Sequence, residues 1–286
     1  MKVLQATHHV QSFKGSSSPH LLLCNDGDCY VAKFHRVETK RALVSEILGI
    51  QIAQRIDLPV PEPLLIEIPE FLIRSTPALS SRTFDDSPTI FPATHFGGTA
   101  GVHNIRRAYD LLPESDLREV SNIESFAGIL AFDLFCGNVG VRKAIFRKSS
   151  ATNNYQVQFI NFDGCFGRKG GFSVDRVHPL YQSRSVYSAI TNWQDFEPYL
   201  YKLLTISPQE IWEMASSIPL DWRGRESLDL ERLIDTLLRR RSRLHAFIDD
   251  TIRLSPASFP EWKSQSRILV AVEDYSWSFL SATTRP

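Results

Sequence analysis

Two side chains that lie five positions apart, Asp133 and Asn138, are the strongest chemical signal in this sequence. An aspartate can accept the proton of an attacking hydroxyl, and an asparagine at this spacing can give its amide oxygen to a metal ion. A second motif, Asp163-Gly164, follows an apolar run where a main Mg²⁺ ligand is expected. Asp-Gly and Gly-Asn are ordinary turn dipeptides, so neither motif is specific alone. Together and in this order they predict phosphoryl transfer.

Phosphoryl transfer also needs a cation that holds the phosphates, and Lys33 is the candidate. It ends the run Val31-Ala32-Lys33, which has the pattern of the phosphate-binding lysine on a kinase strand. Glu46 follows inside a predicted helix, where we expect it to form an ion pair with the lysine. The alternatives are a lysine that reaches water from a strand edge and a glutamate on a solvated helix face.

A loop that covers the phosphates is the remaining requirement. Gly15, Ser16, Ser17 and Ser18 precede a predicted hairpin, and their small side chains leave backbone N–H groups and hydroxyls free to approach an anion. The loop has neither the Walker pattern nor the usual glycine-rich kinase pattern. A plain surface turn is therefore the alternative interpretation of this segment.

The elements that must position these residues follow from periodicity and turn signals. In the first third we expect a hairpin of residues 21–24 and 29–34, a helix over 38–56, strands over 64–68 and 71–73, and an irregular connecting region over 75–101. Farther along we expect a helix over 123–135, short strands over 144–147 and 157–160, a helix that begins with a capping box at 207–210, and a long helix over 228–252. The order predicts an α+β fold with two lobes, a β-rich N-lobe of residues 1–105 and a mainly helical C-lobe of residues 106–286. Asp133 and Asn138, where an apolar helix gives way to a polar loop, should face the cleft between them.

Composition narrows the classes of partner. The 286 residues carry 32 basic and 32 acidic side chains, so no net charge favours a nucleic acid or an anionic membrane. No run approaches about 18 apolar residues, and a cytoplasmic protein is expected. If Asp26-Gly27 is a two-residue turn, Cys24 faces Cys29. We expect free buried thiols there, and a disulfide between the two is the alternative. The basic run over 239–243 is expected on a solvated helix face.

These motifs resemble the bacterial HipA-like kinase domain. The similarity runs from Gly15 to Pro19 into Lys33-Phe34, continues through Glu46 and a Leu-Pro-Val-Pro turn at 58–61, and resumes in the apolar segment that carries Asp133. The resemblance implies a protein-kinase-like fold, use of ATP and Mg²⁺, and transfer of the γ-phosphoryl group to a hydroxyl, with a protein Ser or Thr favoured. It also implies roles for particular residues, namely Asp133 as the base, Asn138 as a metal ligand, Lys33 as the phosphate anchor and Ser16, Ser17 and Ser18 as the phosphate loop.

Two departures from the family pattern leave alternatives open. One is that the segment Val139-Gly140-Val141-Arg142 lacks the acid that often follows the asparagine in this family. The other is that relatives tend to carry an acid directly after the strand, where this chain has Asn161, and the acid comes two positions later at Asp163. Either Asp163 is the metal ligand, or Asn161 replaces the acid and metal binding is weakened. A nucleotide-binding pseudokinase is therefore an alternative. A small-molecule kinase of the aminoglycoside phosphotransferase type is another, although Ala131 stands where those enzymes usually have a histidine.

Overall fold

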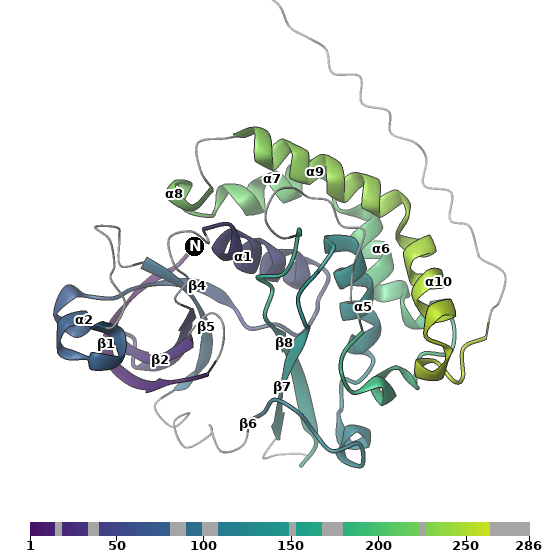
Figure 1. Cartoon of the computed structure of the whole chain (residues 1–286), viewed down its shortest axis with the longest axis horizontal. Coiled ribbons are helices and arrows are strands. Elements are labelled where there is room, and N and C mark those ends of the chain that lie inside the picture. Colours follow the sequence, from purple (N-terminus) through teal and green to yellow (C-terminus); the bar gives the residue numbers. More distant parts are fainter. Residues whose placement is uncertain are drawn as a thin grey trace, which may run out of the picture.

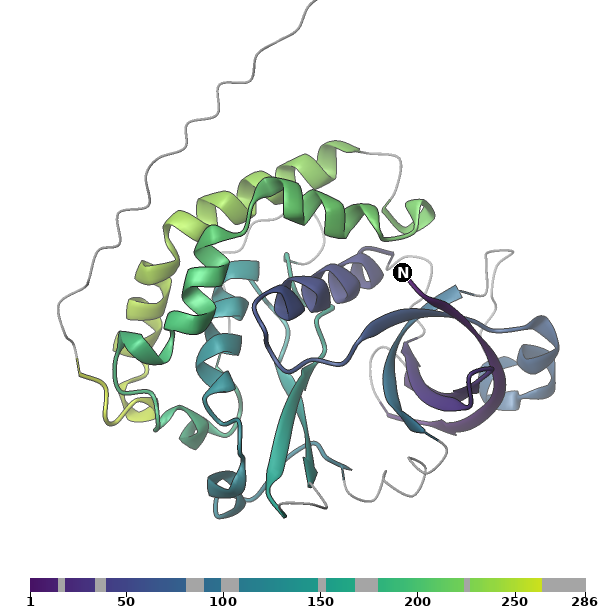
Figure 2. The ribbon, with the colours of Figure 1, turned by 180° about the vertical axis from the view of Figure 1, so that it is seen from behind.

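The computed structural model describes residues 1–14, 19–33, 40–80, 90–98, 108–148, 153–167, 180–223 and 227–263. Two β structures and a layer of helices make up this part of the chain (Figure 1). A closed five-stranded barrel lies to one side, and a three-stranded sheet lies beside it, covered by helices. Seen from behind, helices α5 (Ser125–Cys136), α6 (Glu197–Thr205) and α10 (Leu244–Leu254) lie on the side of the three-stranded sheet that faces away from the barrel (Figure 2).

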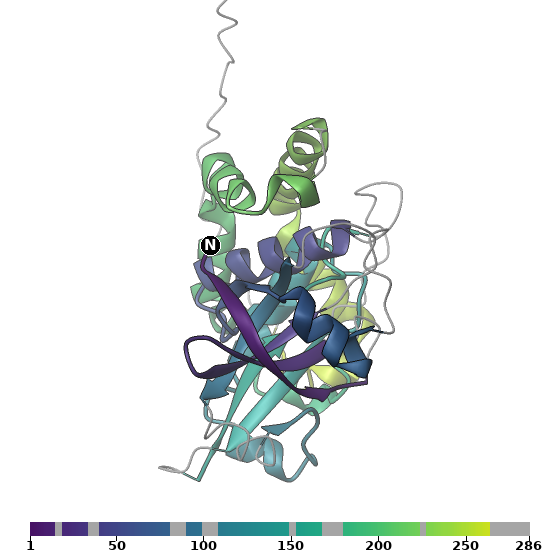
Figure 3. The ribbon, with the colours of Figure 1, turned by 90° about the vertical axis from the view of Figure 1, so that its left-hand side faces the viewer.

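The barrel contains the first predicted hairpin. Its strands are β1 (Val3–Ser12), β2 (Pro19–Cys24), β3 (Asp28–Lys33), β4 (Pro63–Glu67) and β5 (Ile90–Gly98), in the order β1-β2-β3-β5-β4. Neighbours are antiparallel except β1 and β4, whose parallel pairing closes the barrel. Figure 3 shows the molecule from the barrel side, with β1 in purple near the viewer. Alternate side chains point inward and form a separate small core that includes Leu22, Ala32 and Ile66.

The hairpin is confirmed, but its predicted register is wrong by one residue. Leu23 rather than Cys24 pairs with Cys29, because the turn has three residues instead of two. Cys24 instead pairs with Ala6 on β1. Both cysteines are buried free thiols, as expected. A disulfide across this hairpin would need Cys24 and Cys29 to lie directly opposite one another, which this register does not provide.

The region between the barrel and the long buried helix was predicted less well. Residues 71–73, expected as a strand, lie in helix α2 (Glu70–Ser75), which is followed by the short α3 (Pro77–Ser80). The expected irregular region over 75–101 contains strand β5, which pairs with both β3 and β4. The Gly and Pro residues of this segment are unfavourable for a strand, so local preference did not predict one. Strand β5 forms because it pairs with strands that are distant in the chain.

Helix α1 (Lys40–Arg55), predicted over 38–56, contributes its apolar side chains to the large core and not to the small core inside the barrel. Its Ile47, Leu48 and Ile52 belong to the large core that the helices share with the three-stranded sheet. Arg55 forms an ion pair with Glu210 on helix α7 (Pro208–Ser216), and Gln51 donates to the Ser217 hydroxyl at 2.8 Å. The division into an N-lobe of residues 1–105 and a C-lobe of 106–286 stays a prediction, and α1 shares its core with the second part.

The remaining elements agree largely with expectation. They are β6 (Ala108–Tyr109), a 3₁₀ turn (Asp116–Glu119), α5 (Ser125–Cys136), β7 (Lys143–Lys148), β8 (Tyr155–Ile160), 3₁₀ turns (Arg184–Tyr187, Trp193–Asp195), α6 (Glu197–Thr205), α7 (Pro208–Ser216), α8 (Leu220–Arg223), α9 (Ser227–Ser242), α10 (Leu244–Leu254) and a last 3₁₀ turn (Pro256–Ser258). The capping box at Ser207 and Glu210 is confirmed. The single long helix predicted over 228–252 is instead two helices that meet at Arg243.

Helix α5 is the centre of the large core. All twelve of its residues are buried, and it ends where Gly137 adopts a left-handed conformation with φ 61°. Arg240 on α9, expected on a solvated face, is buried instead and donates to the carbonyl oxygens of Leu134 and Phe135. The guanidinium thereby satisfies carbonyls at the carboxyl end of α5 that have no partner within the helix.

Candidate active site

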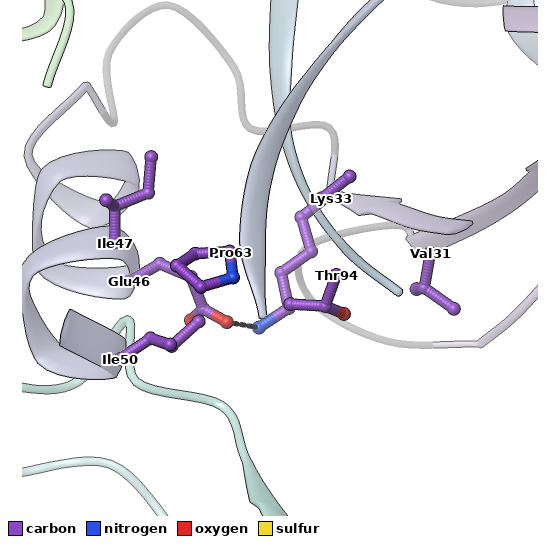
Figure 4. Close-up of a pocket in the computed structure, with 8 residues that line it drawn as sticks. Val31, Lys33, Glu46, Ile47, Ile50, Pro63 and Thr94 are labelled. Carbon is purple, nitrogen blue, oxygen red and sulfur yellow. Dashed lines mark hydrogen bonds and ion pairs between the residues drawn. The ribbon is translucent and has the colours of Figure 1, made fainter. Parts of the chain in front are cut away.

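The predicted pair of Lys33 and Glu46 is present. Lys33 Nζ lies 2.5 Å from Glu46 Oε1, and the two side chains are 13% and 4% exposed. Strand β3 contributes the lysine and helix α1 the glutamate, and the apolar side chains of Val31, Ile47 and Ile50 line the small pocket around them (Figure 4). A cation held in this way at the edge of a partly apolar pocket can bind an anionic group such as a phosphate.

Glu46 also binds the loop that carries the second motif. Its other oxygen accepts a hydrogen bond from the backbone N–H of Phe162 at 2.8 Å. The approach is close because residue 49 of α1 is glycine: a Cβ at Gly49 would stand 2.9 Å from Phe162 Cβ and 3.4 Å from Cys165 Sγ. One carboxylate therefore connects the predicted phosphate anchor to the predicted metal loop.

The prediction that Asp133 and Asn138 face a cleft is wrong. Asp133 is fully buried in the last turn of α5. Its carboxylate accepts from Arg142 Nη2 at 2.5 Å and Nε at 3.1 Å, and from Asn138 Nδ2 at 2.9 Å. Local periodicity placed Asp133 at the end of an apolar helix but could not show that a buried arginine lies against it. A carboxylate enclosed in this way is not placed to accept a proton from a substrate hydroxyl.

Asn138 is also committed to internal hydrogen bonds. It is 1% exposed, its Nδ2 donates to Asp133, and its Oδ1 accepts from the backbone N–H of Gly140 at 2.8 Å. The oxygen that was predicted to bind a metal instead closes a turn two residues long. Because Asn138 is also buried, a metal ion in solvent does not reach its oxygen in this conformation.

Electrostatics agree with a permanent ion pair between Asp133 and Arg142. Burial alone lowers the pKa of Arg142, but the adjacent Asp133 carboxylate raises it above its ordinary value. Burial raises the pKa of Asp133, and Arg142 and Asn138 oppose that effect. We describe the pair as ionised because guanidinium and amide N–H groups donate to both carboxylate oxygens, which leaves the carboxyl group no role as a donor.

No motif in the sequence identified Arg142 as a residue of the site. Besides Asp133 it contacts the metal loop, where its Nη1 donates to the carbonyl oxygens of Ile160 and Asn161, each at 2.9 Å. Its guanidinium also lies 4.2 Å from the centre of the Phe162 ring. A basic residue in a turn after an apolar helix is usually solvated, and no signal in the sequence distinguished this one.

The two candidate metal ligands lie in that loop. Asn161 has a left-handed backbone with φ 70°, a conformation that asparagine tolerates better than most residues. Its Nδ2 donates to the Val141 carbonyl at 3.3 Å. Asp163 is partly exposed, so its carboxylate can reach solvent. A non-glycine residue with a left-handed backbone, such as Asn161, often lies at a functional site. Both Asn161 and Asp163 stay candidates for the metal ligand.

Other expectations concern residues or groups outside this arrangement. Gly15, Ser16, Ser17 and Ser18 lie outside the described residues, so the phosphate loop stays a prediction. Within the described ranges, no three or more His, Cys, Asp or Glu side chains gather as a ready metal site. One aspartate with an amide oxygen nevertheless fits Mg²⁺, which commonly binds one or two carboxylates and takes its other ligands from phosphates and water. In the same ranges no helix is long and apolar enough to cross a membrane.

Comparison with known proteins agrees with a kinase-like fold. Residues 8–139 match the family model of HipA-like kinases, and no curated protein sequence matches the chain. Among solved structures, a proinflammatory kinase of Helicobacter pylori, CtkA, is similar with a TM-score of 0.52 and 15% identity, covering 88% of this chain and 99% of that one. A Golgi casein kinase covers 88% and 73% at 10% identity, but its TM-score of 0.49 is too low to support a conclusion. The match to CtkA shows the fold, and over residues 8–139 this chain is similar to the HipA-like kinases.

Proposed function

We propose that this chain is an ATP-dependent phosphotransferase that holds the phosphates of ATP at Lys33. The observation that carries the proposal is the buried ion pair of Lys33 and Glu46, whose second carboxylate oxygen also binds the loop after β8. A lysine without a partner would point to water, whereas this one is held beside a pocket. An ordered lysine–glutamate pair next to a metal loop is the arrangement that kinases require.

The remaining roles are the ones that the sequence predicts. The backbone N–H groups and hydroxyls of Ser16, Ser17 and Ser18 would cover the phosphates, and Asp163, or Asn161 in its place, would hold Mg²⁺. When bound, Mg²⁺ neutralises phosphate charge. The acceptor is a hydroxyl, with that of a protein Ser or Thr preferred. Asp133 is given no part in proton transfer, and transfer through a loose transition state depends more on positioning and electrostatics than on a strong base.

A second function, nucleotide binding without turnover, is favoured by a specific observation. Asp133 and Asn138 are buried and hydrogen-bonded to each other, so neither is available to a substrate or a metal as predicted. A protein that kept Lys33 and Glu46 but lost a reachable base would bind ATP and transfer its phosphate slowly or not at all. No observation favours the aminoglycoside phosphotransferase alternative over these two.

The two functions separate in one experiment. Thermal unfolding of the full chain is followed with ATP and Mg²⁺, ATP alone and no nucleotide, in the wild type and in Lys33→Met. Binding to the native state raises the melting temperature, and Lys33→Met should remove most of that rise. Release of labelled phosphate from γ-labelled ATP, or its transfer to a mixed protein substrate, then decides between the functions. Binding with transfer supports the phosphotransferase, binding without transfer supports the second function, and an unchanged melting temperature refutes both.

A further inference from the structure

A continuous series of buried contacts joins the carboxyl end of α5 to the Lys33 side chain. Asp133 binds Arg142 through two N–H groups, and Arg142 binds the carbonyl oxygens of Ile160 and Asn161. The next peptide N–H, that of Phe162, donates to Glu46, which forms the ion pair with Lys33. Each contact is between 2.5 and 3.1 Å long.

Arg142 is the member of this series that determines where the loop lies. The backbone at Asn161 is in the left-handed region, and its carbonyl and that of Ile160 converge on one guanidinium nitrogen. The same guanidinium lies over the Phe162 ring, and Phe162 in turn packs against Phe132 with ring centres 5.4 Å apart. Since the side chains of Arg142 and Asp133 are both fully buried, no water can replace these donors without a rearrangement of the core.

Asp133 acts on the loop only through Arg142. It holds the guanidinium by a two-point contact, which fixes the plane of the fork as well as its position. Burial without this carboxylate would leave an unpaired guanidinium among apolar side chains. The aspartate that the spacing marked as a catalytic base is therefore in the right part of the molecule, but its contacts lead to the metal loop and not to a substrate.

We propose that Asp133 and Arg142 are positioning residues that hold the Ile160–Asp163 loop against Glu46, and so keep Lys33 in place for the phosphates. This inference rests on the proposed function for its effect on ATP, but not for its effect on the loop. It assigns the Asp133 motif a role in assembling the site.

The test uses a double variant that removes the ion pair while keeping its volume. Asp133→Leu with Arg142→Met replaces two buried charges by apolar side chains, a change that buried ion pairs often tolerate without loss of stability. The variant has no donor for the carbonyl oxygens of Ile160 and Asn161. Arg142→Lys, which keeps the charge but not the fork, serves if the double variant does not fold. The matched control is Arg240→Lys, because Arg240 is also a buried arginine that binds backbone carbonyls of α5, at Leu134 and Phe135.

Two readouts separate positioning from a merely structural role. In the folded double variant the amide of Phe162 should exchange with solvent at least roughly tenfold faster than in the wild type, while amides inside α5 keep their protection. The affinity for ATP with Mg²⁺ should fall roughly tenfold, about 1.4 kcal/mol, while affinity for adenosine, which has no phosphates, is unchanged. The control variant Arg240→Lys should change neither the exchange rate of the Phe162 amide nor the affinity for ATP relative to that for adenosine.

Each outcome decides something. A folded double variant whose Phe162 amide stays protected and whose ATP affinity is unchanged overturns the positioning role. If the wild type binds no ATP but the Phe162 amide exchanges faster in the double variant, the positioning role is supported and the proposed function is refuted. Equal losses of affinity for ATP and adenosine would mean that the pair supports only the general fold, which also overturns the proposal.

Discussion

Replacement of Gly164 by alanine tests how closely the two loops of the site pack. A Cβ at this position would stand 2.6 Å from the backbone nitrogen of Gly140, 2.7 Å from its Cα, and 2.6 Å from Asn138 Oδ1. Carbon atoms normally approach to about 3.5 Å or more. The loops must therefore move apart by most of an ångström, and the neighbouring atoms are mainly backbone, which cannot turn aside as a side chain can.

The size of the effect follows from the contacts that separation would break. Gly164 accepts a hydrogen bond from the N–H of Val139 at 3.0 Å, and Asn138 accepts one from Gly140 at 2.8 Å. Overpacking costs about 1–3 kcal/mol, and loss of one buried hydrogen bond adds about 1–2 kcal/mol. We expect Gly164→Ala to lower the free energy of unfolding by about 2–5 kcal/mol, or the melting temperature by at least about 5 °C.

Gly140→Ala is the matched comparison. Its added Cβ would lie 3.2 Å from Asn138 Oδ1 and 3.3 Å from Gly164 Cα, so shifts of a few tenths of an ångström suffice. Both substitutions restrict the unfolded chain by a similar amount, about 0.4–1 kcal/mol, and this term cancels between them. Urea denaturation followed by circular dichroism measures the difference. If Gly164→Ala is as stable as Gly140→Ala, the loops do not pack as described and the reasoning fails.

Two further predictions concern helix α1 and its neighbours. Gly49→Ala should push Phe162 away from helix α1 and weaken its hydrogen bond to Glu46, which amide exchange at Phe162 would show as a faster rate. Alanine in place of glycine normally stabilises a helix by about 1 kcal/mol. If the variant gains that full amount, the contact between Gly49 and Phe162 is not as close as described. Hydrogen bonding from the Ser207 backbone N–H lowers the pKa of Glu210 below its ordinary 4.5, so its contribution to stability is complete above that pH and is lost as the pH falls through the lower folded value. Acid unfolding of wild type should accordingly be steeper below pH 4.5 than that of Glu210→Gln, and parallel curves would show that the carboxylate contributes nothing.

The sequence predicted the parts of the site that local rules determine. Lys33 on a strand and Glu46 on the following helix needed only the hairpin, the helix period and the expectation of an ion pair, and the pair is present. The capping box of α7 was also readable, since its donor and acceptor lie three residues apart. Strand β5 could not be predicted from local sequence, because it is stabilised by pairing with β3 and β4 in the barrel.

The position of Asp133 could not be predicted for a different reason. Asp-x4-Asn spacing is the same whether the aspartate faces a cleft or an arginine, and only the fold brings Arg142 to it. The apolar residues around Asp133 were the available warning, because all twelve residues of α5 are buried and a helix that is apolar on every side has no face for a substrate. The apolar residues on every side of this helix therefore favour a buried, paired carboxylate at Asp133 over a catalytic base.

The choice between Asn161 and Asp163 turns on charge as well as position. Asn161 is fixed on both sides, by its carbonyl on Arg142 and by its amide on Val141, so its place is determined by the same contacts that hold the loop against Glu46. Asp163 carries the charge but lies one residue beyond the N–H that Glu46 binds. An amide oxygen alone attracts Mg²⁺ weakly, so a protein that used only Asn161 would depend on the phosphates of ATP to bring the metal. Such a site would bind ATP with little gain from Mg²⁺, whereas one that used Asp163 would show a strong gain. The ratio of the two affinities, compared between Asn161→Ala and Asp163→Ala, identifies which side chain the metal needs.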